Sequence, residues 1–339
     1  MKIAINTRPH AGPWGGGNRF VVAINEALAA GGHEAVTTLD SDVDAVVIVD
    51  PRARNPLVTF TAGAVLRHLA LRNPRTVVVH RINECDERKD TTHMNRRLRL
   101  ANYAADHTVF IASWLRDLGV WRRETSDSVI HNGADRRVFN PTGFEPWPGT
   151  GPLRLVTHHW GAHELKGFDV YRRLDSLMSD ARWVGRVEFT YVGNLPASAG
   201  LRNTRVVAPL DGDALASELR RHHGYITASL NEPGGMHHVE GSLCGLPLLY
   251  RRSGALPEYC GPFGIEFEGA HDVETALERY VSSYTALVGR MSSYPYDAEL
   301  TCRRWIELLS GLVARRDEIA ARRKLWRDPA AFMLGQLPL

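Results

Sequence analysis

An uninterrupted apolar run between two aspartates, Asp44-Ala-Val-Val-Ile-Val-Asp50, gives the clearest structural signal in this chain of 339 residues. A strand that is covered on both faces of a parallel sheet has this composition, because neither of its faces meets water. The segment Thr76-Val-Val-Val-His80 repeats the pattern, and segments with apolar residues near helical spacing lie between such runs. Strands that alternate with helices predict right-handed βαβ connections and a doubly wound α/β fold.

The same alternation extends along most of the chain. It predicts strands at Lys2–Asn6, Asp44–Asp50, Thr76–His80, His107–Ala112, Ser128–His131, Leu153–Thr157, Val187–Val192, Arg205–Val207 and Gly224–Ser229. It predicts helices at Asn18–Ala30, Phe168–Met178 and Asp213–Arg221. The tail Cys302–Arg327 is amphipathic and charged, which also favours a helix.

A change of composition near the middle of the chain predicts a domain boundary. The segment Phe139–Pro152 contains four prolines and three glycines, which excludes a regular helix or a central strand and favours a linker. The length suits two domains of roughly 150 residues each. We therefore expect two Rossmann-like domains, residues 1–145 and 151–305, that face a central cleft. A C-terminal helix at about 310–339 is expected to cross back to the first domain.

Composition and charge narrow the class of protein. Hydrophobic residues make up 44% of the chain and charged residues 23%, which excludes a wholly disordered protein. The net charge of +3, without a concentrated basic stripe, argues against a nucleic-acid partner. No apolar run approaches the roughly 20 residues of a membrane helix, and no signal-peptide pattern follows Met1, so we expect a cytoplasmic protein with at most peripheral membrane contact. Four scattered cysteines without a Cys-x-x-Cys pair argue against a thiolate zinc site or a disulfide framework.

The most informative segment for function is Ser229-Leu-Asn-Glu-Pro-Gly-Gly-Met-His-His-Val-Glu-Gly-Ser-Leu-Cys-Gly-Leu-Pro247. Glu232 follows a predicted strand, and the proline and two glycines after it predict a tight turn with exposed backbone N–H groups. A helix is expected to begin near Gly235, so that Glu240 projects from its early turns. Such a helix N-terminus favours an anion such as a diphosphate, while carboxylates accept hydrogen bonds from the hydroxyl groups of a sugar.

The Glu-x7-Glu spacing, continued by Gly-Ser-Leu-Cys-Gly-Leu-Pro, resembles the donor-binding signature of retaining glycosyltransferases of the GT-B fold, in particular glycosyltransferase family four. Three further segments are similar to motifs of that family. They are the interdomain junction at Val129–Pro141, the phosphate-binding Lys-Gly loop at His158–Asp169 and the Gly-Gly loop at Gly15–Arg19. The resemblance spans the chain from the first strand to about Tyr259.

The resemblance implies a role for each motif residue. Glu240 would bind the ribose diol of the donor, and Glu232 would contact the hydroxyl groups of the transferred sugar. Lys166 would neutralise the leaving diphosphate, which agrees with the general rule that a positioned cation stabilises charge developing in a transition state. The other implied donor-binding residues are Gly16, Gly17, His158, Gly234, Gly235 and Met236.

The resemblance also implies an acceptor side. His80, placed at the end of a predicted strand, matches a histidine of the family and is expected to act with Glu232 and Lys166 by hydrogen-bonding the donor sugar or the acceptor. The polar run Asn83–Lys89 after it is a candidate acceptor surface.

One departure from the family pattern concerns the phosphate site. Family members commonly carry an arginine a few residues before the lysine of the Lys-Gly loop, and this chain does not. His158, His159, His163 or an arginine from elsewhere are the candidates to replace it.

These observations together predict an enzyme. It would be a retaining, metal-independent glycosyltransferase that moves a hexose-type sugar from a UDP- or GDP-linked donor to an acceptor hydroxyl by front-face displacement. The acceptor would be a sugar, a lipid-linked sugar or a secondary metabolite, and no cofactor is expected besides the nucleotide sugar as co-substrate. The histidine-rich segments lack the paired spacing of a metal site. The alternatives are a non-catalytic nucleotide-sugar-binding protein and a GT-B epimerase or phosphorylase.

Overall fold

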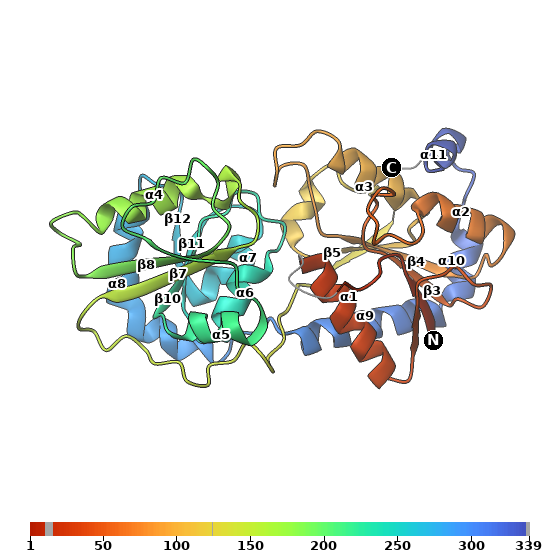
Figure 1. The fold of residues 1–339 in the computed structure, drawn as a ribbon. Helices are drawn as coiled ribbons and strands as arrows, with labels where there is room; N and C mark the ends of the chain where they lie inside the picture. The colour runs from red at the N-terminus through yellow and green to blue at the C-terminus, as the bar shows by residue number, and fades with distance from the viewer. Residues whose placement is uncertain (11–15, 124, 337–339) are drawn as a thin grey trace. The chain divides into compact units, whose positions relative to one another are not determined.

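The computed structural model describes residues 1–10, 16–123 and 125–336, and the chain forms two compact units (Figure 1). The first unit comprises Met1–His131 and Ala298–Leu339, and the second comprises Asn132–Asp297. Each unit contains one six-stranded sheet whose neighbouring strands run parallel. The predicted class, two doubly wound α/β domains, is confirmed.

The sheet of the first unit has the strand order β2-β1-β3-β4-β5-β6. Its strands are β1 (Lys2–Ile5), β2 (Glu34–Val36), β3 (Ala45–Ile48), β4 (Val77–Ile82), β5 (His107–Phe110) and β6 (Ser126–Val129). The α-helices described in this unit are α1 (Gly16–Ala30), α2 (Ala62–Leu71), α3 (Met94–Ala101), α9 (Ala298–Ala314), α10 (Arg316–Arg322) and α11 (Pro329–Leu334). The unit also contains two 3₁₀ turns, η1 (Asn102–Ala104) and η2 (Ser113–Asp117).

Helices cover both faces of this sheet. Val47 and Val79 belong to a buried cluster with side chains of α1 and α9, whereas Val46 and Val78 belong to a cluster with side chains of α2 and α11. Successive residues of a strand point to opposite faces, so both sets must be apolar when both faces are covered. This is why the strands are continuous apolar runs in the sequence.

The C-terminal segment completes the core of the first unit. Trp305 of α9 is buried and its ring lies 5.1 Å from that of Phe20 on α1, centroid to centroid. The prediction that the C-terminal tail returns to the first domain is therefore confirmed. The tail forms the three helices α9, α10 and α11 instead of one.

The sheet of the second unit has the strand order β9-β8-β7-β10-β11-β12. Its strands are β7 (Leu153–His159), β8 (Val187–Gly193), β9 (Arg205–Val207), β10 (Gly224–Thr227), β11 (Leu248–Arg251) and β12 (Gly264–Phe267). Its described α-helices are α4 (Phe168–Leu177), α5 (Gly212–Arg220), α6 (Met236–Leu243), α7 (Leu256–Cys260) and α8 (Val273–Met291), with the 3₁₀ turns η3 (Glu164–Lys166) and η4 (Gly261–Phe263). The segment Phe139–Pro152 contains no helix or strand.

One strand differs from its prediction in a way that concerns function. β4 continues to Ile82, so the prediction that His80 ends the strand is wrong. Arg81 interrupts the apolar pattern in the sequence, but its side chain is buried and its guanidinium lies 4.2 Å from the centre of the Phe20 ring. A cation over an aromatic face replaces part of the lost hydration, which lets a charged residue sit inside the strand.

Within the described ranges, every helix falls short of the length or the hydropathy that crossing a lipid bilayer requires.

Buried histidines should make the fold sensitive to acid. Burial lowers the pKa of His80 to about 3 and the pKa values of His222 and His238 to about 4. In the unfolded chain these groups titrate near their ordinary pKa of about 6.5, so below that pH the unfolded state binds protons that the folded state does not. Their contribution is complete above pH 6.5 and is lost as the pH falls towards 4. We expect the free energy of unfolding to fall by up to about 1.4 kcal/mol per pH unit for each such histidine.

Urea unfolding at pH 7.5, 6.5, 5.5 and 4.5 measures this slope. The variant His80→Leu should have a shallower slope, whereas His271→Gln, a change at an imidazole that is 77% exposed, should leave it unchanged. A free energy of unfolding that is constant between pH 6.5 and 4.5 would contradict the prediction.

Candidate functional site

The candidate site of the second unit lies where the order of its sheet reverses. The chain proceeds from β7 to β8 and β9 on one side and then returns to β10, beside β7, to continue on the other side. In open parallel sheets, ligands bind at the carboxyl ends of the strands at such a reversal. His158 and His159 end β7, and the turn that carries Glu232 follows β10.

A buried ion pair joins the two loops at this point. Nζ of Lys166 donates to Oε2 of Glu232 at 2.8 Å, and the two side chains are only 6% and 3% exposed. Lys166 ends the turn η3, and the next residue, Gly167, has a φ of 96°, where a Cβ would lie 2.3 Å from Ala228. Glycine at this position therefore lets the lysine loop approach the end of β10 closely.

The backbone on both sides of Glu232 is held by neighbouring loops. Its carbonyl accepts from the Ala255 N–H at 2.8 Å, and a Cβ on Gly254 would lie 2.6 Å from the Glu232 nitrogen. Asn132 donates its Nδ2 to the Gly234 carbonyl at 2.7 Å, which fixes the glycine turn. We did not predict this role of Asn132 from the sequence, because the local sequence around it does not show that it is buried beside the glycine turn.

Helix α6 starts directly after this turn, at Met236, as expected. Gly235 is its N-cap and has an extended backbone. Because glycine has no side chain, it does not cap the N–H groups of the first turn. A Cβ on Gly235 would lie 2.6 Å from the His237 ring and 3.0 Å from the Glu232 carboxyl carbon, so a side chain there would displace one or both of them. Backbone N–H groups at a helix start and the helix dipole favour an anion.

A second carboxylate is held by a chain of hydrogen bonds. Nε2 of His158 lies 2.8 Å from Oε2 of Glu240, and Nδ1 of His158 lies 3.0 Å from the hydroxyl of Tyr225. Since a carboxylate accepts, Nε2 of His158 donates to Glu240, and the hydroxyl of Tyr225 contacts the other nitrogen of the ring. Sequence analysis did not identify Tyr225, because it reads as an ordinary strand residue.

His238 lies among these groups. Burial lowers its pKa to about 4, and Glu232, Glu240, Lys166 and His158 are all close enough to influence it electrostatically. Neither of its ring nitrogens has a hydrogen-bond partner in the described part of the chain. The structure thus brings together Lys166, Glu232, Glu240 and His158, which the sequence motifs had singled out.

Two neighbouring histidines have structural partners. His159 pairs with the Tyr171 hydroxyl at 2.7 Å and His237 with the Thr227 hydroxyl at 2.8 Å. Burial lowers the pKa values of both imidazoles well below their ordinary range, so they are neutral. His163 lies beside Lys166, since a Cβ on Gly161 would be 3.4 Å from the His163 ring and 3.9 Å from Cε of Lys166.

The predicted residues of the first unit are described within that unit. His80 is fully buried inside β4, its Nδ1 accepts from Nδ2 of Asn102 at 3.2 Å, and its Nε2 has no hydrogen-bond partner among the described residues. Gly16 and Gly17 form the first residues of α1, and a Cβ on Gly17 would lie 3.3 Å from Nδ2 of Asn83. Gly15 falls outside the described residues.

In the ranges that the structure covers, no three histidine, cysteine, aspartate or glutamate side chains gather so that they could hold a metal ion.

Comparisons with known proteins give matches in structure alone: no family model and no curated protein matches the sequence. Sucrose-phosphate synthase of Thermosynechococcus elongatus superposes with a TM-score of 0.62 at 16% identity, over 93% of this chain and 99% of that one. HepE of Anabaena, solved with UDP and glucose, superposes with a TM-score of 0.63 at 14% identity, over 92% and 99%. AviGT4, a glycosyltransferase involved in avilamycin A biosynthesis, gives 0.62 at 14% identity, over 93% and 98%. The chain therefore has the two-domain α/β GT-B fold.

Proposed function

We propose that the protein is a retaining glycosyltransferase that moves a hexose-type sugar from a nucleoside diphosphate sugar to an acceptor hydroxyl. The observation that carries this proposal is the buried Lys166–Glu232 pair beside the start of α6, at the reversal point of a parallel sheet. The fold supports it, because structures with the same fold include HepE in complexes with UDP and with UDP-glucose.

Lys166 is the residue assigned to the leaving group. When a nucleoside diphosphate departs, negative charge grows on its phosphate oxygens, and an ammonium held in a dry site stabilises that charge without reorganisation. The N–H groups of Gly235 and Met236 would bind the same anion. Glu232, only 2% exposed and in contact with Lys166, would accept hydrogen bonds from the hydroxyl groups of the sugar.

Glu240 is the residue assigned to the ribose. Its carboxylate is oriented by His158, which is in turn fixed by Tyr225. A carboxylate held in this way is suited to a vicinal diol, which offers two donors at a fixed spacing.

The proposed transfer retains the configuration at the anomeric carbon. The bond from that carbon to the diphosphate breaks with its electron pair leaving on the diphosphate. The acceptor oxygen forms the new bond on the same face, and the acceptor proton passes to the leaving phosphate oxygen. We assign His80 no step in this transfer, because its ring is enclosed in the core of the first unit. Nuclear magnetic resonance of the product's anomeric configuration, together with nucleoside diphosphate release from UDP- and GDP-hexoses, tests the proposal.

Replacement of the lysine should abolish most of the turnover. We expect Lys166→Met to lower kcat/KM by about a hundredfold or more, because one preorganised charge contact at a developing anion is lost. Steady-state release of nucleoside diphosphate measures this. Lys324→Met, at an exposed lysine, is the matched control. A loss below about threefold in Lys166→Met would place the leaving group elsewhere.

The loss of charge in Lys166→Met also leaves Glu232 buried without its cation, which destabilises the fold. The double variant Lys166→Met/Glu232→Gln removes both charges and should recover melting temperature relative to the single variant without recovering activity. Recovered activity would mean that Lys166 acts only through stability.

The two glutamates should differ in the kinetic constant that they control. Glu240→Gln should weaken binding of the nucleoside diphosphate by about tenfold, the scale of one charged hydrogen bond. Glu232→Gln should lower kcat more than it weakens binding, because it removes a contact to the reacting sugar. Calorimetric titration with UDP and initial rates measure the two effects. Wild-type values in both variants would contradict the site.

Activity should not depend on a divalent metal. Lys166 and the α6 N–H groups supply the positive charge that a metal supplies in other transferases, so dialysis against EDTA should leave the rate unchanged. An activity that disappears with EDTA and returns with Mg²⁺ or Mn²⁺ would overturn this part of the proposal.

A further inference from the structure

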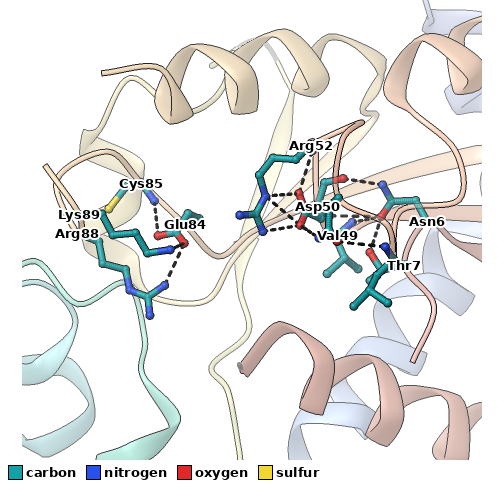
Figure 2. A network of polar contacts seen from close by, with 11 residues as sticks. Asn6, Thr7, Val49, Asp50, Arg52, Glu84, Cys85, Arg88 and Lys89 are labelled. Atoms are coloured by element: carbon teal, nitrogen blue, oxygen red, sulfur yellow. Dashed lines mark hydrogen bonds and ion pairs between the residues drawn. The ribbon is translucent and has the colours of Figure 1, made fainter. Parts of the chain in front are cut away.

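The sheet of the first unit has a reversal point of its own. β1 lies between β2 and β3, so the chain changes side between β1 and β3. Asn6 follows β1, Asp50 follows β3, and Glu84 follows β4, the next strand of the sheet. Polar side chains from three adjacent strands therefore meet the edge where parallel sheets bind ligands (Figure 2).

Asn6 fixes the backbone at this point. It is 1% exposed, its Oδ1 accepts from the Val49 N–H at 2.8 Å, and its Nδ2 donates to the Asp50 carbonyl at 2.7 Å. One amide side chain thus ties the end of β1 to the end of β3, which leaves the position of Asp50 little freedom.

Asp50 in turn holds an arginine. Its carboxylate accepts from Nε of Arg52 at 2.9 Å, from Nη2 of Arg52 at 2.6 Å and from Nδ2 of Asn55 at 2.8 Å. Burial alone would raise the pKa of Asp50, but these hydrogen bonds lower it, so the carboxylate stays charged. Its oxygens are occupied by these donors, and its role is to orient Arg52.

Arg52 is held on one side and open on the other. Two of its nitrogens bind Asp50, while Nη1 makes no hydrogen bond with any residue in the described ranges. Its side chain is 40% exposed. Figure 2 shows the guanidinium on the side of Asp50 that faces Glu84. Such a preorganised guanidinium is the protein group best matched to a carboxylate or a phosphate.

The charges around Arg52 are of both signs. Arg88 and Lys89 both pair with Glu84, at 3.0 and 3.5 Å, and Glu84 and Arg88 are close enough to Arg52 to influence its pKa. Glu84 is engaged by Arg88 and Lys89, and Asp50 is saturated by its own donors, so neither carboxylate takes up Nη1 of Arg52.

We propose that Arg52 and its neighbours form a subsite for an oxyanion, a carboxylate or a phosphate group, carried by the sugar acceptor. The identification of the ligand as the sugar acceptor rests on the proposed glycosyl transfer. The binding of an oxyanion at Arg52 does not depend on it. It narrows the acceptor to molecules with an acidic group and excludes neutral sugars as the preferred substrates.

The test measures oxyanion binding directly, in a protein whose diphosphate site has been disabled. In the full-length double variant Lys166→Met/Glu232→Gln, which removes both charges of the buried pair, we would titrate inorganic phosphate, glucose 6-phosphate, glucuronate and neutral glucose by calorimetry. We expect at least one oxyanion to bind, glucose not to bind at a comparable concentration, and Arg52→Met to weaken the oxyanion by about tenfold or more. The phosphate and glucuronate arms show which oxyanion is preferred.

Matched variants separate charge from folding. Arg75→Met is the control, because Arg75 also pairs with an aspartate of this unit, Asp317, but is not among the groups at this edge. Arg52→Lys keeps the charge and should retain part of the binding, which a purely structural role of Arg52 would not predict. Oxyanion affinity that is equal in Arg52→Met and Arg75→Met, or the absence of any oxyanion binding, would overturn the inference.

Titration of UDP into Arg52→Met keeps this inference apart from the proposed function. Unchanged UDP binding with lost oxyanion binding supports both. An absence of both UDP and GDP binding to the wild-type protein would refute the donor assignment and leave the oxyanion measurement standing.

Discussion

The ion pair between Lys166 and Glu232 is the interaction on which the site of the second unit depends. Withdrawing two opposite charges from water is costly, and their mutual attraction offsets that cost only when the geometry is well defined. The fold provides this geometry with glycines that allow close approach, Gly167 against Ala228 and Gly254 against the Glu232 backbone. The pair is thus a product of tight loop packing. A bound diphosphate would compete with Glu232 for the ammonium group of Lys166.

The two sheets place their polar residues by the same rule. In each sheet the order in which the chain adds strands reverses once, between β1 and β3 in the first unit and between β7 and β10 in the second. Polar side chains gather at the carboxyl ends of the strands at these points. In the second unit the charges are buried and paired with each other. In the first unit a buried aspartate holds an arginine that remains partly exposed. The buried pair of the second unit suits a ligand that enters deeply. The partly exposed arginine of the first unit suits recognition of a charged group at the surface.

The fold could be predicted largely because both faces of each sheet are covered. Doubly covered strands such as β3 are apolar throughout, and this pattern needs no knowledge of tertiary contacts. The strands β2, β11 and β12 were not predicted; β2 and β12 each contain a glutamate and so lack the continuous apolar run that marks strands such as β3. The place of His80 was misjudged because the strand continues through Arg81, whose buried guanidinium packs on the Phe20 ring.

The motif residues of the candidate site were identified from their spacing, whereas the residues that hold them were not. Tyr225 and Asn132 act through hydrogen bonds to residues 67 and 102 positions away in the sequence, which no local pattern reports. Their side chains are ordinary in their own segments and gain a role only from the tertiary fold.

The return of α9 to the first unit has a consequence for synthesis on the ribosome. The buried cluster that joins α1 to the sheet also includes Trp305, Leu309 and Leu312, so it stays open until those residues have emerged. The second unit is built from one continuous stretch, and its core needs nothing beyond Asp297. The later-encoded unit can therefore fold first. Until α9 has been synthesised, one apolar face of the N-terminal sheet is incompletely covered. In that period the nascent chain can bind chaperones or aggregate.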